Sequence, residues 1–92
     1  MKPSMTANEV IRSWIKDNLY SRGEFTFSSV HIQVNVVEHG VDRLIYHTPD
    51  MYSREWRRIR ENIKVYDCVY KFKVEEFFKK GSKVKWYRVT RS

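Results

Sequence analysis

Arginine side chains are concentrated in residues 48–60, which read Thr-Pro-Asp-Met-Tyr-Ser-Arg-Glu-Trp-Arg-Arg-Ile-Arg. A guanidinium group can bind a phosphate, or the O6 and N7 of guanine, through two parallel hydrogen bonds. At about 100° per residue, a helix here would place Arg54, Arg57 and Arg58 on one side. Its other side would be apolar, formed by Tyr52, Trp56, Ile59 and Ile63. The spacing predicts a helix with one face in a core and the other facing an anion, and the phosphate backbone of DNA suits that face best.

The start of this segment has residue types that begin helices. Thr48 can accept hydrogen bonds from free backbone N–H groups, and Pro49 suits the first helical position. The free N–H groups and the partial positive charge at such a start also suit a phosphate. The alternative is a solvated face held by ion pairs such as Arg57 with Glu61, four residues apart. Three arginines with fewer matching acids favour the anion-binding interpretation.

The excess of positive charge lies entirely in the second half of the chain. The net charge is +7, yet residues 1–53 hold five basic side chains against six acidic ones. Residues 54–92 hold thirteen basic side chains against five acidic ones. A localised positive field speeds the encounter with a polyanion and adds affinity by releasing counterions. Lysine-rich surfaces also keep small proteins soluble, which is the alternative explanation.

Other kinds of chemistry find little support in the sequence. His31, His39 and His47 are spaced by eight residues and no cysteine pair accompanies them, so we expect no metal site. The single cysteine, Cys68, excludes an internal disulfide, fits a reducing cytoplasm and is expected to be a buried thiol. The sequence has no nucleophile–base pairing, no glycine-rich phosphate loop, no signal peptide and no apolar run of about 20 residues. We therefore expect a cytoplasmic protein that is not an enzyme, needs no cofactor and does not enter a membrane.

The first half of the chain predicts two helices around a short extended piece. Residues 1–5 are expected to be a loose tail and residues 6–92 a single domain. Thr6 and Glu9 form a capping-box pattern before a helix over residues 7–22 that Gly23 ends. Residues 25–27 alternate as in a strand. A second helix, carrying Val30, Val34 and Val37, is expected from Ser28 or Ser29 to Gly40. Residues 30–36 also alternate as in a strand, but the serine before them and the glycine after them favour a helix.

The second half predicts a helix followed by a hairpin. After an apolar connection at residues 41–47, the arginine-rich helix is expected over 49–62. Residues 66–75 alternate between apolar and polar types, which indicates a strand with one buried face. A turn at 79–82 and a returning strand at 83–90 would complete the hairpin. The spacing leaves open whether Val84 and Trp86, or Tyr87 and Val89, form the buried face of the second strand.

The predicted hairpin is also rich in lysine and aromatic residues. Its lysines can contact phosphates, or they can protect an edge strand from aggregation. The basic residues in question are Lys71, Lys73, Lys79, Lys80, Lys83 and Lys85. Aromatic rings interleave with them, as in Tyr70-Lys71-Phe72-Lys73, and such rings can stack on unpaired bases of RNA or single-stranded DNA. In a domain of 92 residues we expect these rings to belong to the core instead.

The chain resembles a winged helix-turn-helix domain over about residues 6–90. The resemblance is carried by Thr48-Pro49, Ser53-Arg54, Arg57-Arg58-Ile59 and the hairpin ending Trp86-Tyr87-Arg88-Val89. It implies an α+β fold with three helices, a short strand and a C-terminal two-stranded wing. In this family the third helix lies in the DNA major groove. Two departures are that Tyr52 and Trp56 stand where aliphatic residues are common, and that the connection before the third helix is longer than a tight turn.

The resemblance also implies a set of nucleic-acid contacts. Ser53, Arg54, Arg57 and Met51 would face the groove, with one or two of the arginines on bases and the remaining ones, Arg58 among them, on phosphates. At the wing tip, Lys79, Lys80 and Lys83 would lie near phosphates or the adjacent minor groove.

We expect a small prokaryotic or phage transcription regulator that binds double-stranded DNA with full or partial sequence specificity. A homodimer would address two half-sites about one helical turn apart. The alternative is an interaction module, such as a phage-encoded inhibitor, that docks on an acidic or nucleic-acid-binding host protein. Preference for RNA over duplex DNA would be a third outcome.

Overall fold

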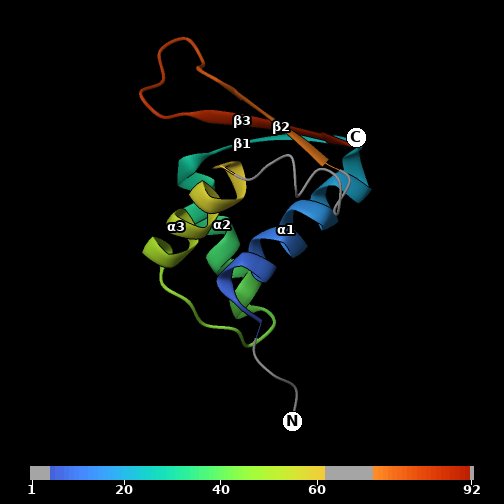
Figure 1. The fold of residues 1–92 in the computed structure, drawn as a ribbon, viewed down its shortest axis with the longest axis vertical. Coiled ribbons are helices and arrows are strands. Elements are labelled where there is room, and N and C mark those ends of the chain that lie inside the picture. Colours follow the sequence, from blue (N-terminus) through green and yellow to red (C-terminus); the bar gives the residue numbers. More distant parts are fainter. Residues whose placement is uncertain (1–4, 62–71, 92) are drawn as a thin grey trace.

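The computed structural model describes residues 5–61 and 72–91, which form three helices and a three-stranded antiparallel sheet. In chain order the elements are α1 (Ala7–Arg22), β1 (Glu24–Ser28), α2 (Ser29–Val41), α3 (Pro49–Glu61), β2 (Phe72–Phe77) and β3 (Trp86–Arg91). The helices form one layer against the sheet, and the connection between β2 and β3 projects beyond it (Figure 1). The predictions for Ile63, Cys68 and the strand residues 66–71 lie outside the described residues, as do residues 1–4.

The sheet places β3 between β1 and β2. Phe27 of β1 lies opposite Tyr87, and Val74 of β2 lies opposite Val89. Tyr87 and Val89 are buried, so they form the core face of the returning strand that the sequence left undecided. Strand β1 therefore belongs to the same sheet as the C-terminal hairpin, although more than 55 residues of chain separate β1 from β3.

The returning strand begins at Trp86 and not at Lys83, because the preceding residues fold around one hydroxyl group. Ser82 Oγ accepts hydrogen bonds from the backbone N–H of Val84 at 3.4 Å and from Trp86 Nε1 at 3.2 Å. The Ser82 N–H donates to the Lys79 carbonyl at 3.0 Å. These bonds make a turn in place of further strand pairing, while β2 continues to Phe77, two residues beyond the expected end.

Helix α1 has the boundaries and caps that the sequence predicted. Thr6 Oγ1 accepts from the Glu9 N–H at 3.2 Å, and the Thr6 N–H donates to the Glu9 carboxylate at 3.3 Å. The bond from the Thr6 N–H, and then the one that the Thr6 hydroxyl donates to the same carboxylate at 3.0 Å, hold the pKa of Glu9 below its ordinary value. Gly23 ends the helix with a positive φ of 75°, which glycine adopts at little cost. Met5, expected in the tail, instead packs against the core, and its carbonyl accepts from His47 Nε2 at 2.8 Å.

Helix α2 is a helix, as favoured, but it does not end at Gly40 as predicted. The helix continues to Val41, and the chain reverses at Leu44, which has a positive φ of 60°. The Ile45 N–H donates to the Gly40 carbonyl at 2.8 Å across this reversal. Gly40 is buried against Tyr52. The two residues are so close that a Cβ atom at position 40 would lie 2.8 Å from the Tyr52 hydroxyl oxygen. Close packing of two helices, and not chain reversal, requires this glycine.

The core between the helices and the sheet is largely aromatic. Phe27 lies at its centre, with ring centroids 5.0 Å from Trp14, 5.2 Å from Trp56 and 5.6 Å from Tyr87. Rings at such separations gain both burial and favourable edge contacts. Trp56 and Tyr52, the bulky departures from the winged-helix pattern, are accommodated there. Within residues 5–61 and 72–91, no helix combines the length and apolar character needed to cross a bilayer.

The buried hydroxyl group of Tyr52 is a site where we expect a substitution to stabilise the protein. The Tyr52 side chain is fully buried, and its hydroxyl has no hydrogen-bond partner among the described residues. Removing an unsatisfied buried hydroxyl recovers part of its desolvation cost. We expect Tyr52→Phe to raise the free energy of unfolding by about 1 kcal/mol in urea denaturation monitored by circular dichroism. A loss of stability would show that the hydroxyl has a bonding partner in solution.

Candidate nucleic-acid interface

Helix α3 separates an apolar face from a basic one, as its sequence predicted. Tyr52, Trp56 and Ile59 are 0%, 2% and 0% exposed. Arg54 and Arg57 are exposed on the opposite side. At the start of the helix, Thr48 Oγ1 accepts from the Met51 N–H at 3.2 Å, which confirms the predicted cap. The apolar face fixes the helix to the core, so the basic face can contact a ligand without any rearrangement of the core.

The three arginines on this side differ in their partners. Among the residues that the structure describes, neither Arg54 nor Arg57 forms a hydrogen bond or an ion pair. Arg58 Nη1 lies 3.3 Å from the Glu55 carboxylate, whose other oxygen accepts from Asn8 of α1 at 3.3 Å. An exposed ion pair contributes little stability, so Arg58 can exchange it for a phosphate. Arg54 and Arg57 need no exchange, which makes them the stronger candidates.

The other two predicted contact residues on α3 lie at its borders. Ser53 is partly buried and accepts a hydrogen bond from Gln33 Nε2 of α2 at 3.1 Å. Its hydroxyl proton can still donate to a ligand, but the side chain mainly joins two helices. Met51 is 41% exposed and lines a shallow depression with Asn8, Glu55 and Arg58. Met51 can offer an apolar contact at the edge of the basic face.

The hairpin presents lysines at its far end. Lys80 and Lys83 are exposed, whereas the Lys79 ammonium lies 3.7 Å from the centroid of the Trp86 ring. This cation–π contact orients Lys79 without neutralising it, so the charge remains available to an anion. Lys73 is exposed on β2, and Lys71, on the predicted strand before it, lies outside the described residues.

The acidic residues of the hairpin face basic partners within the protein. Glu75 lies 3.7 Å from Arg88 Nη1, and Glu76 lies 3.6 Å from Lys85 Nζ. Arg88 also lies 3.5 Å from Glu24 of β1. The lysines of the connection, at 79, 80 and 83, and Lys73 of β2 are among the basic groups of the hairpin for which no acidic partner occurs in residues 5–61 and 72–91.

Arg60 is a residue whose importance the sequence did not indicate. Its Nη1 donates to Glu76 Oε1 at 2.7 Å, and its guanidinium lies 5.3 Å from the centroid of the Tyr87 ring. The hydrogen bond from Arg60 is the main cause that lowers the pKa of Glu76. Arg60 thereby ties the end of α3 to both strands of the hairpin. Because Arg60 and Glu76 are 16 residues apart on different elements, no local spacing could have revealed the pair.

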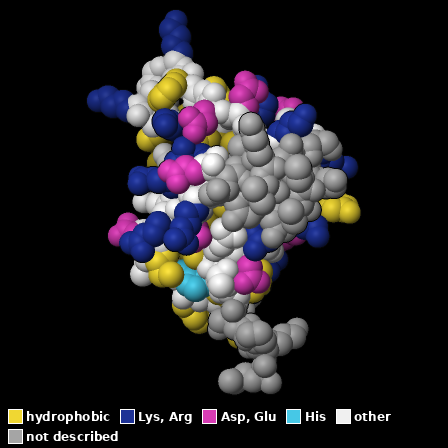
Figure 2. Space-filling view, in the orientation of Figure 1, with side chains coloured by type: hydrophobic (Ala, Val, Ile, Leu, Met, Phe, Trp, Pro, Cys, Tyr) yellow, Lys and Arg dark blue, Asp and Glu magenta, His cyan; other side chains and the backbone are white. Residues whose placement is uncertain are grey.

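Basic side chains occur at several places on the face of the molecule that Figure 2 shows, including the edge opposite α3. Figure 2 shows Lys and Arg over α3 and at the far end of the hairpin, with acidic side chains between them. The predicted contact residues thus come from two elements that Arg60 holds together. A helix flanked by a basic projection can contact a groove and the neighbouring phosphate backbone at once.

The histidines have local structural contacts. His31 Nδ1 accepts from the Ser28 N–H at 2.9 Å, and His39 shares a hydrogen bond of 3.1 Å with Ser13. His47 bonds the Met5 carbonyl and lies against the Tyr52 ring. Over the described ranges, 5–61 and 72–91, no group of three or more potential metal ligands occurs.

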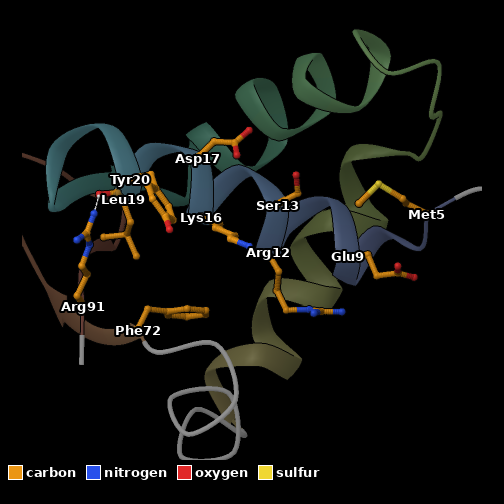
Figure 3. A pocket seen from close by; sticks show the side chains of 10 residues that line it. All are labelled: Met5, Glu9, Arg12, Ser13, Lys16, Asp17, Leu19, Tyr20, Phe72 and Arg91. Atoms are coloured by element: carbon orange, nitrogen blue, oxygen red, sulfur yellow. Dashed lines mark hydrogen bonds between the residues drawn. The ribbon is translucent and has the colours of Figure 1, made fainter.

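A pocket of about 760 Å³ runs along α1, away from the predicted contact residues. Figure 3 shows side chains of both charges around it, with Arg91 Nη2 bonded to the Leu19 carbonyl at 3.3 Å. None of the eight residues predicted to contact nucleic acid lines this pocket. Its mixed charge gives no preference for an anion.

Comparison of the chain with models of known protein families, with curated proteins and with solved structures found no match. The function is therefore inferred from the side chains of α3 and of the hairpin.

Proposed function

We propose that this protein is a winged helix-turn-helix domain that binds double-stranded DNA through α3 and the β2–β3 hairpin. The observation that carries the proposal is the division of α3. Tyr52, Trp56 and Ile59 are packed in the core, while Arg54 and Arg57 are exposed and have no acidic partner among the described residues. Unpaired guanidinium groups on a rigid helix are arranged for an external anion.

The order and pairing of the elements support the same proposal. Three helices precede a C-terminal hairpin, and the short strand after the first helix pairs with the last strand in the order β1-β3-β2. The order of the elements is the one expected from the sequence resemblance, and the pairing of β1 with β3 adds the short strand to the same sheet. In this arrangement, α3 would be the recognition helix and the β2–β3 hairpin would be the wing, with the connection of residues 78–85 at its tip.

The chemistry of binding follows from the two basic elements. The α3 helix fits the width of the B-DNA major groove, where an arginine can read guanine through O6 and N7. Arg54 and Arg57 would contact bases or the flanking phosphates, and Arg58 would exchange Glu55 for a phosphate. Lys79, Lys80 and Lys83 are point charges that suit phosphates and read bases poorly. Arg60 would keep the wing at a constant distance from the helix.

A protein of this kind would act by occupying a site on DNA and thereby blocking or recruiting polymerase. The proposed class is a small transcription regulator of a prokaryote or phage.

Salt dependence of duplex binding tests the proposal directly. We expect a fluorescein-labelled duplex of about 20 base pairs to bind with an affinity that falls log-linearly with salt. If about five phosphates are contacted, the slope of log K against log salt is about −4.5. Fluorescence anisotropy between about 50 and about 200 mM salt measures it.

Single-stranded DNA and an RNA hairpin of equal charge are the comparison ligands. Weaker binding to both supports duplex recognition. Tighter binding to RNA would replace the proposal with an RNA-binding function. Failure to bind any of the three at low salt would favour docking on a protein.

A further inference from the structure

Helix α2 has a second apolar face that the fold leaves exposed. Val30, Val34 and Val41 are 50%, 49% and 43% exposed, and Val37 is partly buried. At about 100° per residue these four valines fall within an arc of about 60°, forming one stripe along the helix. The residues that α2 buries in the core are Ile32, Val36 and Gly40. Val30, Val34 and Val41 are therefore additional to the core face, while Val37, which packs against the core, lies between them and completes the valine stripe of residues 30, 34, 37 and 41.

Folding of a single chain accounts for Val37, which packs against the core, but not for the exposed Val30, Val34 and Val41. Valine is a weaker helix former than alanine, glutamate or lysine, because its branched side chain loses rotamer freedom in a helix. An exposed valine also returns little of the free energy that burial would provide. The spacing of four, three and four residues is that of the apolar seam between two paired helices.

We propose that the valine stripe of α2 pairs with the same stripe of a second copy of this chain, with the two helices antiparallel about a two-fold axis. The stripe is symmetric about the midpoint between Val34 and Val37. Antiparallel pairing places Val30 opposite Val41 of the second copy, and Val34 opposite Val37. A surface that matches itself in this way is what a two-fold dimer requires.

The charges on α2 select the antiparallel direction. The acidic residues of the helix and its C-cap, Glu38 and Asp42, lie in the C-terminal part, where they oppose the helix dipole. The basic residue that follows them, Arg43, forms an ion pair with Asp17 of α1 at 3.2 Å. Residues 29–35 contain no acidic side chain. Antiparallel pairing brings the acidic end of one helix beside the positive N-terminal end of the other. Parallel pairing would gather both acidic ends at the same end of the dimer.

The two-fold axis also determines where the α3 helices lie. Gln33, beside the stripe, bonds Ser53 of α3, so α3 lies along one flank of the stripe. Rotation about an axis perpendicular to the antiparallel pair leaves that flank on the same side in both copies. The two α3 helices therefore share one side of the dimer. The pairing itself does not depend on the function proposed for α3.

The expected affinity is modest. A stable dimer interface buries about 1,600 Å², and one face of a 13-residue helix provides less. We expect a dissociation constant on the order of 10–100 µM. Sedimentation velocity from about 5 µM to about 1 mM should show the sedimenting mass rising from one chain of 11.2 kDa toward two.

Two double variants locate the interface. Val30→Gln with Val34→Gln should keep the protein monomeric over the whole range, while circular dichroism shows an unchanged helix content. Leu44→Gln with Phe78→Gln removes two exposed apolar side chains outside α2 and should leave the dissociation constant within about threefold. A wild-type protein that stays monomeric at about 1 mM, or a dimer lost only in the second variant, overturns the proposal.

A third variant tests the direction of pairing. Glu38→Lys with Asp42→Lys places positive charge beside the N-terminus of the partner's helix and should weaken the antiparallel dimer several-fold. The same change favours the helix dipole within each chain, so the fold itself should not be weakened. An unchanged or tighter dimer would contradict the antiparallel arrangement.

Discussion

Replacing Arg54 and Arg57 together with alanine is expected to lower affinity for duplex DNA by at least about 30-fold. Each side chain is exposed and has no acidic partner in the described part of the chain, so its full charge is available to DNA. Losing two phosphate or base contacts should also flatten the salt slope by up to about two units. Because neither arginine contributes to the core, thermal unfolding should change by no more than about 2 °C. Anisotropy titration and a melting curve measure both effects.

The matched control removes the same charge from a different surface. Lys16 and Arg22 are exposed on α1, so Lys16→Ala with Arg22→Ala lowers the net charge by the same amount. We expect its affinity to stay within about threefold of the wild-type protein. Equal losses in the two double variants would mean that binding responds only to net charge. Wild-type affinity in the Arg54 and Arg57 variant would remove α3 from the contact surface.

Replacing Gly40 by alanine is expected to lower the free energy of unfolding by about 2–3 kcal/mol. In an open helix the same change is stabilising by about 1 kcal/mol, because alanine is the better helix former. Here the added Cβ would lie 2.8 Å from the Tyr52 hydroxyl oxygen and 2.9 Å from the Ile45 carbonyl oxygen. The phenol is fully buried and the carbonyl belongs to the backbone, so neither can move away easily. The melting temperature should fall by about 10 °C or more.

Two further variants identify the cause of that loss. Asn35→Ala changes an exposed position of α2 and should be neutral or slightly stabilising. Gly40→Ala combined with Tyr52→Phe should recover part of the stability, because one of the two close contacts is removed while the Ile45 carbonyl remains. Urea denaturation of the wild type, Gly40→Ala, Tyr52→Phe and the combined variant gives the four free energies of a double-mutant cycle. A Gly40→Ala protein as stable as the wild type would show that α2 and α3 are packed less closely than the structure indicates.

Local signals in the sequence were sufficient for both ends of α1, for the start of α3 and for the two faces of α3. The Thr6 cap, the Gly23 stop and the Thr48 cap act between residues no more than four apart. Such contacts form within a single turn of helix, so residue spacing alone predicts them. The burial of Tyr52 and Trp56 opposite the exposed Arg54 follows from the helical period for the same reason.

Local signals gave wrong predictions where one residue type can serve two different structural purposes. Gly40 was expected to end a helix, which is the common use of glycine, but it lies inside α2 because Tyr52 needs the space. The returning strand was expected from Lys83, but Ser82 bonds the following residues into a turn.

The sequence by itself determined the helices, their caps and a basic face on the third of them, because each of these depends on neighbours along the chain. Only the tertiary structure decided which face of α2 enters the core, where Ile32 and Val36 are buried and Val30 and Val34 are not. Only the tertiary structure paired Arg60 with Glu76, and so joined α3 to the hairpin. These outcomes depend on how helices pack against a sheet whose strands are far apart in sequence, and residue spacing carries no information about that packing.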